Sequence, residues 1–218
     1  MPLQLPSLYV IADIDTLARH GMPLADFTQQ VLAAGVRWIQ LRDKSGSPQQ
    51  VLAHAAEMQA VVNGTDCRLL MNDRADLALL AGWSAVHVGH TDLPPGAVHQ
   101  LFRKAGGEAG AASAVVGVST HDEAQVRAAD AGEADYIAVG PVFATGTKAD
   151  AEPVIGLEGV RRARVLTGKP LVAIGGITLE SARSVRDAGA DSVAIIGALF
   201  RPGVSVEATA REFLQVLA

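Results

Sequence analysis

The sequence has little cysteine, few aromatic residues and no excess of positive charge. Its 218 residues include one cysteine, Cys67, so no disulfide can form within the chain, which is typical of a reducing compartment. Aromatic residues make up 4 % of the chain and apolar residues 49 %, which predicts an aliphatic core. The net charge of −5 provides no basic field for nucleic acid or anionic lipid. An anionic substrate would therefore need a local cluster of cations.

Long apolar runs are also lacking, and none approaches the length of a membrane span. The first residues, "MPLQLPSLYVIADID", carry neither a basic start nor a long apolar stretch, so we expect no signal peptide. These features together predict a soluble, cytoplasmic protein. No neighbouring residue forms an activating pair with Cys67, so we expect it to be a small residue entering a strand and not a nucleophile.

Short runs rich in β-branched residues recur at fairly even spacing. They are typical of strands buried on both faces, and they cover residues 7–13, 37–43, 68–73, 84–89, 114–120, 135–142, 170–176 and 191–199.

Helical patterns lie between these runs. Residues 23–35 end at Gly35, and residues 47–64 begin with a Ser47 cap and Pro48 and end at Gly64. Residues 120–132 and 178–189 each place a Ser or Thr cap shortly before acidic residues.

Strand and helix alternate eight times, which predicts a parallel sheet in an α/β protein. At this length we expect a single (β/α)₈ TIM barrel over residues 1–218. The alternative is an open doubly wound sheet, but that fold usually has fewer strands, and no glycine-rich turn follows the first strand here. In such a barrel the active site lies at the C-terminal ends of the strands.

Polar residues gather at those strand ends. Gln40, Arg42 and Lys44 alternate along the second strand and so project to one side, which is a suitable grip for an anion. Salt bridges at a strand end are the alternative explanation.

Two carboxylates follow neighbouring strands, Asp73 after the third and Asp92 after the fourth. With nearby cations and amides, including Asn72, they suit Mg²⁺, which prefers a few carboxylates together with phosphate oxygens. The alternative role for each aspartate is a helix N-cap, and this is strongest for Asp73 because a helix is expected to start there.

Anion-binding features also follow the later strands. Ser119 ends the fifth strand, and Thr145, Thr147 and Lys148 follow the sixth in a loop that suits a phosphate cradle or a lid. The seventh and eighth strands end in glycine, at Gly176 and at Ile196-Gly197, ahead of helix N-termini that commonly bind phosphate.

No nucleophile–base pair stands out among these residues. We expect His87 to point inward from its strand in a packed or hydrogen-bonded role. A site with phosphate grips and a metal, but without an evident base, favours chemistry driven by a good leaving group such as pyrophosphate.

The segments "IQLRDK", "LLMNDRADLAL", "VHVGHTDLP", "GVSTHDEAQVRAADAGEADYIAVGPVFATGTK" and "AIGGIT" resemble, in order, the motifs of the thiamine-phosphate synthase family. The resemblance implies a (β/α)₈ barrel with Mg²⁺ as cofactor. It implies that 4-amino-2-methyl-5-(diphosphooxymethyl)pyrimidine is joined to 4-methyl-5-(2-phosphoethyl)thiazole, giving thiamine phosphate and pyrophosphate. The partners would be these small molecules, and the chain could form a homo-oligomer.

The resemblance also assigns roles to individual residues. It implies a pyrimidine diphosphate site, a metal site and a thiazole phosphate site. The pyrimidine diphosphate site would use Gln40, Arg42, Lys44, Asn72 and Ser119, with Lys148 on the departing pyrophosphate. The metal site would use Asp73 and Asp92. The thiazole phosphate site would use Thr145, Thr147, Gly176, Ile196 and Gly197. Lys148 and Ser119 would be the catalytic residues. Arg74 is expected to be structural or to support its neighbours.

The chain departs from the family pattern at His90, Thr91, Ala144 and Gly197, and none of these changes removes a proposed metal ligand or the lysine. Two other functions stay open: a thiazole tautomerase-like relative, with His121 as its acid–base group, and a non-catalytic phosphate-binding barrel.

Overall fold

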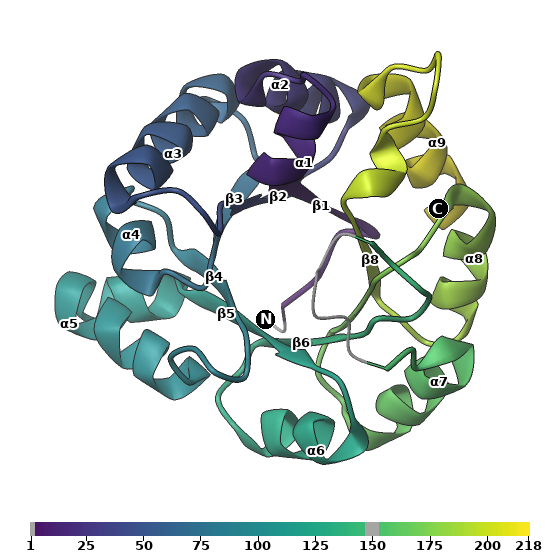
Figure 1. Ribbon diagram of the computed structural model, residues 1–218. Coiled ribbons are helices and arrows are strands. Elements are labelled where there is room, and N and C mark those ends of the chain that lie inside the picture. Colours follow the sequence, from purple (N-terminus) through teal and green to yellow (C-terminus); the bar gives the residue numbers. More distant parts are fainter. Residues whose placement is uncertain (1–2, 147–152) are drawn as a thin grey trace.

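The chain forms a closed barrel of eight parallel strands surrounded by helices (Figure 1). The computed structural model describes residues 3–146 and 153–218. Each strand pairs in parallel with the next along the chain, and Val10 lies opposite both Ile39 of β2 and Ile195 of β8, which closes the sheet. The predicted barrel is therefore confirmed, and the open-sheet alternative is wrong.

The strands fall inside the ranges expected from the sequence. They are β1 (Leu8–Asp13), β2 (Trp38–Arg42), β3 (Arg68–Asn72), β4 (Ala85–Val88), β5 (Val115–Thr120), β6 (Tyr136–Val139), β7 (Leu171–Ile174) and β8 (Ser192–Ile195). The helices are α1 (Ile14–Arg19), α2 (Leu24–Ala34), α3 (Pro48–Val62), α4 (Ala75–Leu80), α5 (Pro95–Ser113), α6 (Glu123–Ala131), α7 (Gly156–Leu166), α8 (Leu179–Asp187), the short 3₁₀ helix η1 (Gly197–Leu199) and α9 (Val206–Leu217).

The helix ends confirm two of the expected capping signals and contradict a third. Gly35 ends α2 with a φ of 106°, in the left-handed region that glycine adopts without steric cost. Ser47 caps α3 and accepts a hydrogen bond from the Gln50 backbone N–H at 3.3 Å. The cap expected of residues 120–132 was wrong, because Asp122 caps α6 while Thr120 lies in β5 and donates to the Ala138 carbonyl.

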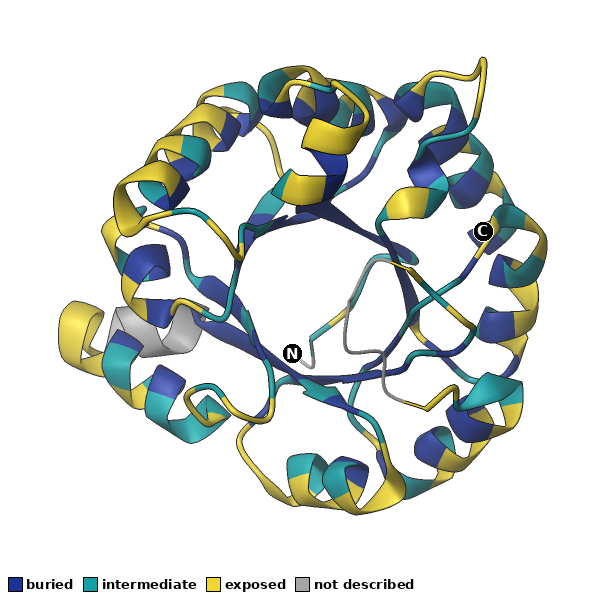
Figure 2. Ribbon diagram, in the orientation of Figure 1, coloured by how far each residue is buried: buried dark blue, intermediate teal, exposed yellow. Residues whose placement is uncertain are grey.

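Two apolar layers hold the barrel together. The larger one lies between the strands and the surrounding helices and is mainly aliphatic, as composition predicted. The smaller one fills the barrel interior around Tyr9, Trp38 and Tyr136, and Leu3 and Leu5 pack against it from the N-terminal segment. In Figure 2 the strands are mostly buried, whereas the outward faces of the helices are exposed.

A glycine in β5 makes room for the central aromatic ring. A Cβ atom added at Gly117 would lie 1.9 Å from Cζ of Tyr136, on the neighbouring strand β6. Any larger side chain at this position would therefore displace the Tyr136 ring from the barrel interior.

No helix in the described parts of the chain is both long enough and apolar enough to cross a membrane.

An ion pair outside the barrel makes stability depend on pH. His99 Nε2 on α5 lies 3.1 Å from Asp135 Oδ2, and the hydrogen bond to Asp135 raises the pKa of His99 above its ordinary value. A group whose pKa rises on folding stabilises the protein fully below its unfolded-state pKa, and this contribution is lost as pH rises through the folded-state pKa. We therefore expect His99→Asn to lower the free energy of unfolding more at pH 5.5 than at pH 8.5, measured by urea titration.

The matched control is His20→Asn, because the His20 ring stacks on Phe200 and forms no ion pair with any side chain that the structure describes. An equal loss at both pH values for His99→Asn would contradict the role given to the His99 charge.

Candidate functional site

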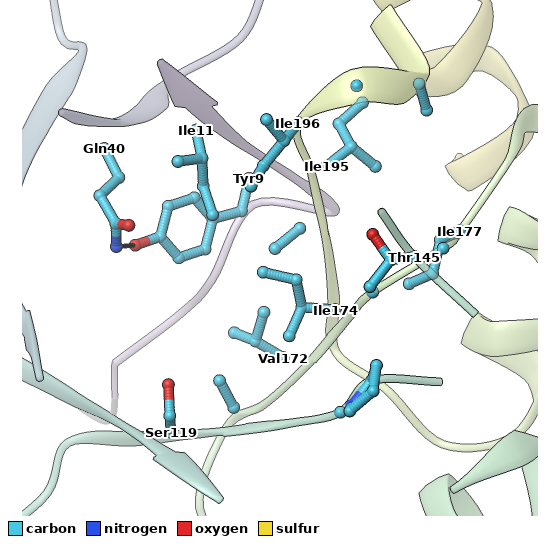
Figure 3. A pocket seen from close by; sticks show the side chains of 18 of the residues that line it. Tyr9, Ile11, Gln40, Ser119, Thr145, Val172, Ile174, Ile177, Ile195 and Ile196 are labelled. Carbon is cyan, nitrogen blue, oxygen red and sulfur yellow. Dashed lines mark hydrogen bonds between the residues drawn. The ribbon is translucent and has the colours of Figure 1, made fainter. Parts of the chain in front are cut away.

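A cavity of about 540 Å³ opens at the C-terminal ends of the strands. One side of its wall is apolar, with Ile11, Val172, Ile174 and Ile196 facing the interior (Figure 3). Its polar lining includes Arg42, Asn72, Ser119 and Thr145, which come from different strand ends and loops. The cavity thus lies at the mouth of the barrel, where the sequence placed the active site.

The three residues expected to grip an anion take separate positions. Gln40 is 2 % exposed and donates a hydrogen bond to the Tyr9 hydroxyl at 2.6 Å, inside the barrel. Arg42 lines the cavity and forms an ion pair with Asp13, whereas Lys44 lies beyond the end of β2 and pairs with Asp73. The salt-bridge alternative is confirmed for the two cations, and the anion grip stays a prediction.

Asp13 is a site residue that sequence reasoning missed. It is buried at the end of β1, and its second oxygen caps α1 by accepting hydrogen bonds from the Thr16 backbone N–H at 2.9 Å and from its hydroxyl at 2.6 Å. The same carboxylate therefore begins a helix and orients Arg42. An aspartate just before a helix signals a cap in any sequence, but only the parallel pairing of Asp13 with Arg42 across β1 and β2 shows the second role.

The two candidate metal ligands lie together beside the cavity, at the ends of β3 and β4. Asp92 Oδ2 accepts a hydrogen bond from the Gly89 backbone N–H at 2.8 Å. Burial and the neighbouring Asp73 carboxylate raise the pKa of Asp92 above its ordinary value, although that backbone hydrogen bond opposes the rise. The Asp73 charge thus makes ionisation of Asp92 more costly, and a carboxylate pair this close is a suitable binding site for a divalent cation.

Asp73 does not cap the following helix, so the N-cap alternative is wrong for it. The residue at the N-cap of α4 is Arg74, which makes no side-chain capping bond and pairs instead with Asp76. Asp73 has a φ of 62°, which is unusual for a residue with a side chain. This conformation turns its carboxylate toward Lys44, and strain of this kind often marks functional positions.

These donors fit a hard cation such as Mg²⁺. Both are carboxylates, and the phosphate oxygens of a ligand in the cavity would supply further oxygen ligands. Among residues 3–146 and 153–218, no group of three or more His, Cys, Asp or Glu side chains is arranged to hold a metal ion. Two carboxylates at this position suit a cation that a phosphorylated ligand would also bind.

The glycine-ended strands line the opposite side of the cavity. Gly176, Ile196 and Gly197 all contribute to its wall, together with Thr145. Gly176 has a φ of 64°, and an added Cβ would lie 2.4 Å from the Ala144 carbonyl oxygen, so the loop after β6 packs directly on this glycine. Thr147 and Lys148 lie outside the described residues, and their roles stay predictions.

Polar side chains inside the barrel are hydrogen-bonded to one another. His87 lies between Tyr136 and Ser119, with ring nitrogens 2.9 Å from each hydroxyl, which confirms the hydrogen-bonded role expected for this histidine. The Tyr136 hydroxyl lies 3.2 Å from that of Tyr9. Sequence reasoning missed both tyrosines, because each sits in an apolar strand where an aromatic residue is usually a packing element.

A model of one protein family covers residues 8–199, and it is described as thiamine monophosphate synthase. The chain belongs to this family. Its relatives include the thiamine-phosphate synthase of Koribacter versatilis (strain Ellin345), which is 45 % identical over 217 residues, covering 99 % of this chain and 97 % of that one. The thiamine-phosphate synthase of Methanospirillum hungatei JF-1 is 35 % identical, covering 96 % and 97 % of the two chains.

Among solved structures, thiamine phosphate pyrophosphorylase from Pyrococcus furiosus superposes with a TM-score of 0.80 at 28 % identity. This match covers 97 % of this chain and 95 % of the other. Membership of the thiamine monophosphate synthase family confirms the resemblance found in the sequence motifs. Because the matches extend over almost the whole chain, they include the strand ends that carry Arg42, Asp73, Asp92 and Ser119.

The double role of Asp13 can be tested by unfolding. We expect Asp13→Ala to lower the free energy of unfolding by about 3 kcal/mol, because it removes a helix cap and leaves Arg42 partly buried without its partner. Asp13→Asn should still lose about 2 kcal/mol, since its amide oxygen caps α1 but its side chain carries no charge for Arg42. The measurement is equilibrium denaturation in urea.

Ser205→Ala provides the matched control, because Ser205 caps α9 at the surface by accepting a hydrogen bond from the Ala208 backbone N–H. That variant should lose about 1 kcal/mol. Equal losses for Asp13→Ala and Ser205→Ala would show that the Arg42 pair contributes nothing to stability.

Proposed function

We infer that this protein is a thiamine-phosphate synthase, a transferase of thiamine biosynthesis. It joins 4-amino-2-methyl-5-(diphosphooxymethyl)pyrimidine to 4-methyl-5-(2-phosphoethyl)thiazole and releases thiamine phosphate and pyrophosphate. The observation that carries the proposal is the division of the barrel mouth. A cluster of Lys44, Asp73 and Asp92 lies on one side, and glycine-ended strands lie across an apolar cavity.

The charged side suits the diphosphate of the pyrimidine substrate. Arg42 and Asn72 line the cavity next to the Lys44–Asp73 pair, so a diphosphate placed there meets two cations and an amide donor. Asp73 and Asp92 would hold Mg²⁺, which supplies electrostatic stabilisation of the departing pyrophosphate when it is bound. Lys148 is proposed to neutralise the same leaving group.

The apolar wall suits the reacting carbon. When the C–O bond breaks, its electron pair leaves with pyrophosphate, and the pyrimidine is left as a carbocation that its amino-substituted ring stabilises. Ile11, Val172 and Ile174 exclude water, which would otherwise capture this cation. The thiazole nitrogen attacks with its own lone pair, so the reaction requires no strong base.

The glycine-ended side suits the thiazole phosphate. Gly176, Ile196 and Gly197 bring backbone close to the cavity, and Thr145 adds a hydroxyl from the loop after β6. With Thr147, these groups would place the phosphate so that the thiazole nitrogen points across the cavity toward the pyrimidine. The homo-oligomer and the reducing compartment expected from the sequence stay predictions.

The proposal is tested by supplying both phosphorylated precursors and measuring thiamine phosphate, with Mg²⁺ and with a chelator. We expect product formation that depends on the metal. Circular dichroism on the same sample checks the fold. A folded protein that forms no product would contradict the proposal, and interconversion of thiazole carboxylate tautomers would then be measured to test the tautomerase alternative.

The assignment of Asp73 makes a separate prediction. We expect Asp73→Asn to raise the Mg²⁺ concentration needed for half-maximal activity by at least about tenfold, because it removes one of two anionic ligands. Asp76→Asn is the matched control, since Asp76 lies three residues along on α4 and pairs at the surface with Arg74. Superimposable Mg²⁺ titrations for Asp73→Asn and the unmodified protein would remove Asp73 from the metal site.

A further inference from the structure

Five side chains form a continuous hydrogen-bonded chain through the barrel interior. In order they are Gln40 on β2, Tyr9 on β1, Tyr136 on β6, His87 on β4 and Ser119 on β5. The successive donor–acceptor distances are 2.6 Å, 3.2 Å, 2.9 Å and 2.9 Å. The first and last members, Gln40 and Ser119, both line the cavity, and Figure 3 shows them on different sides of it.

The direction of this chain follows from its first bond. The Gln40 amide nitrogen donates to the Tyr9 oxygen, which leaves the Tyr9 proton to be donated onward. Tyr9 is buried, and a buried hydroxyl without an acceptor is costly, so its proton is directed to the Tyr136 oxygen. By the same reasoning the buried Tyr136 donates to Nδ1 of His87.

The last two bonds then decide what Ser119 can do. A neutral imidazole that accepts at Nδ1 carries its proton on Nε2, and here Nε2 faces the Ser119 oxygen at 2.9 Å. Ser119 receives that hydrogen bond, so its own proton is directed away from His87. Since Ser119 lines the cavity, this proton is available to an acceptor atom of a bound ligand.

We propose that Tyr136 and His87 are positioning residues that fix the Ser119 hydroxyl as a hydrogen-bond donor to the pyrimidine diphosphate. The proposal rests on the proposed function for the identity of the ligand, but the direction of the chain is a property of the free protein. In this role Ser119 is neither a nucleophile nor a base. It offers a proton to a ring nitrogen or a phosphate oxygen of the substrate.

Two properties of the interior support a fixed direction. Burial raises the pKa of both Tyr9 and Tyr136, so both phenols stay protonated over the working pH range and each supplies one proton to the chain. Gly117 leaves the space that the Tyr136 ring occupies, and the ring is held edge-on against Tyr9 and Trp38 at centroid distances of 6.3 Å and 5.8 Å. Packing therefore places the Tyr136 oxygen beside His87.

The direction can be measured in the free protein by nitrogen-15 NMR at pH 8, where a neutral imidazole distinguishes its protonated from its unprotonated nitrogen. His87→Gln identifies the signals of His87 among the six histidines. We expect the Nε2–H tautomer. An Nδ1–H tautomer would mean that Ser119 donates to His87, and this would overturn the proposal whatever reaction the protein catalyses.

Two tyrosine variants form a matched pair, because each removes one buried hydroxyl and keeps its ring. Tyr136→Phe takes away the donor to His87, so we expect the Nε2–H tautomer to lose its dominance. Tyr9→Phe leaves the Tyr136 donor in place, so the tautomer should not change. If both variants change the tautomer equally, or if neither changes it, Tyr136 does not set the state of His87.

The effect on substrate is tested by a double-mutant cycle with the synthase assay. We expect Tyr136→Phe to lower kcat/KM for the pyrimidine diphosphate by about tenfold, while KM for the thiazole phosphate changes less than about twofold. In a Ser119→Ala background the same change should lower kcat/KM by less than about twofold, because Tyr136 acts through the serine. An equal loss in both backgrounds would show that Tyr136 has only a structural role. Absence of synthase activity in the unmodified protein would contradict the proposed function and leave the NMR result standing.

Discussion

Closure of the sheet between β1 and β8 is the constraint on which the site depends. A barrel of eight parallel strands directs every strand end toward one mouth, so side chains that are distant along the chain, such as Arg42 and Ser119, line one cavity. Closure also fixes the interior diameter. Aromatic rings fill the space at the level of Tyr9, Trp38 and Tyr136, and the cavity begins above them.

The charged groups of the mouth are compensated in pairs before any ligand arrives. Arg42 is held by the buried Asp13, and Lys44 is held by Asp73. A partly buried guanidinium without a partner would destabilise the protein, so the pair with Asp13 keeps Arg42 in place at a tolerable cost. The Lys44–Asp73 pair is more exposed and correspondingly weaker, so Lys44 can leave this partner at little cost.

The interior shows how packing and polarity are joined in this barrel. The tyrosine rings contribute apolar surface to the interior cluster, while their hydroxyls meet in a chain that reaches the cavity. A buried polar network of this kind stabilises one arrangement only when every member has a partner. Gly117 provides the space, Tyr136 fills it, and the resulting position of one oxygen atom determines the environment of His87 and Ser119.

The sequence by itself determined the fold and several of the residues that line the cavity. Short β-branched runs and strand-end polar residues are local signals, with a period of two or a fixed position in a βα unit. It determined that Asp73 and Asp92 follow neighbouring strands, and its ordered motifs determined the family. Only the tertiary structure decided that Asp73 adopts a positive φ and does not cap α4, that Asp13 is the partner of Arg42, and that two tyrosines join Gln40 to Ser119. These relations join residues up to 127 positions apart, and they arise from strand register and ring packing, which no local pattern records.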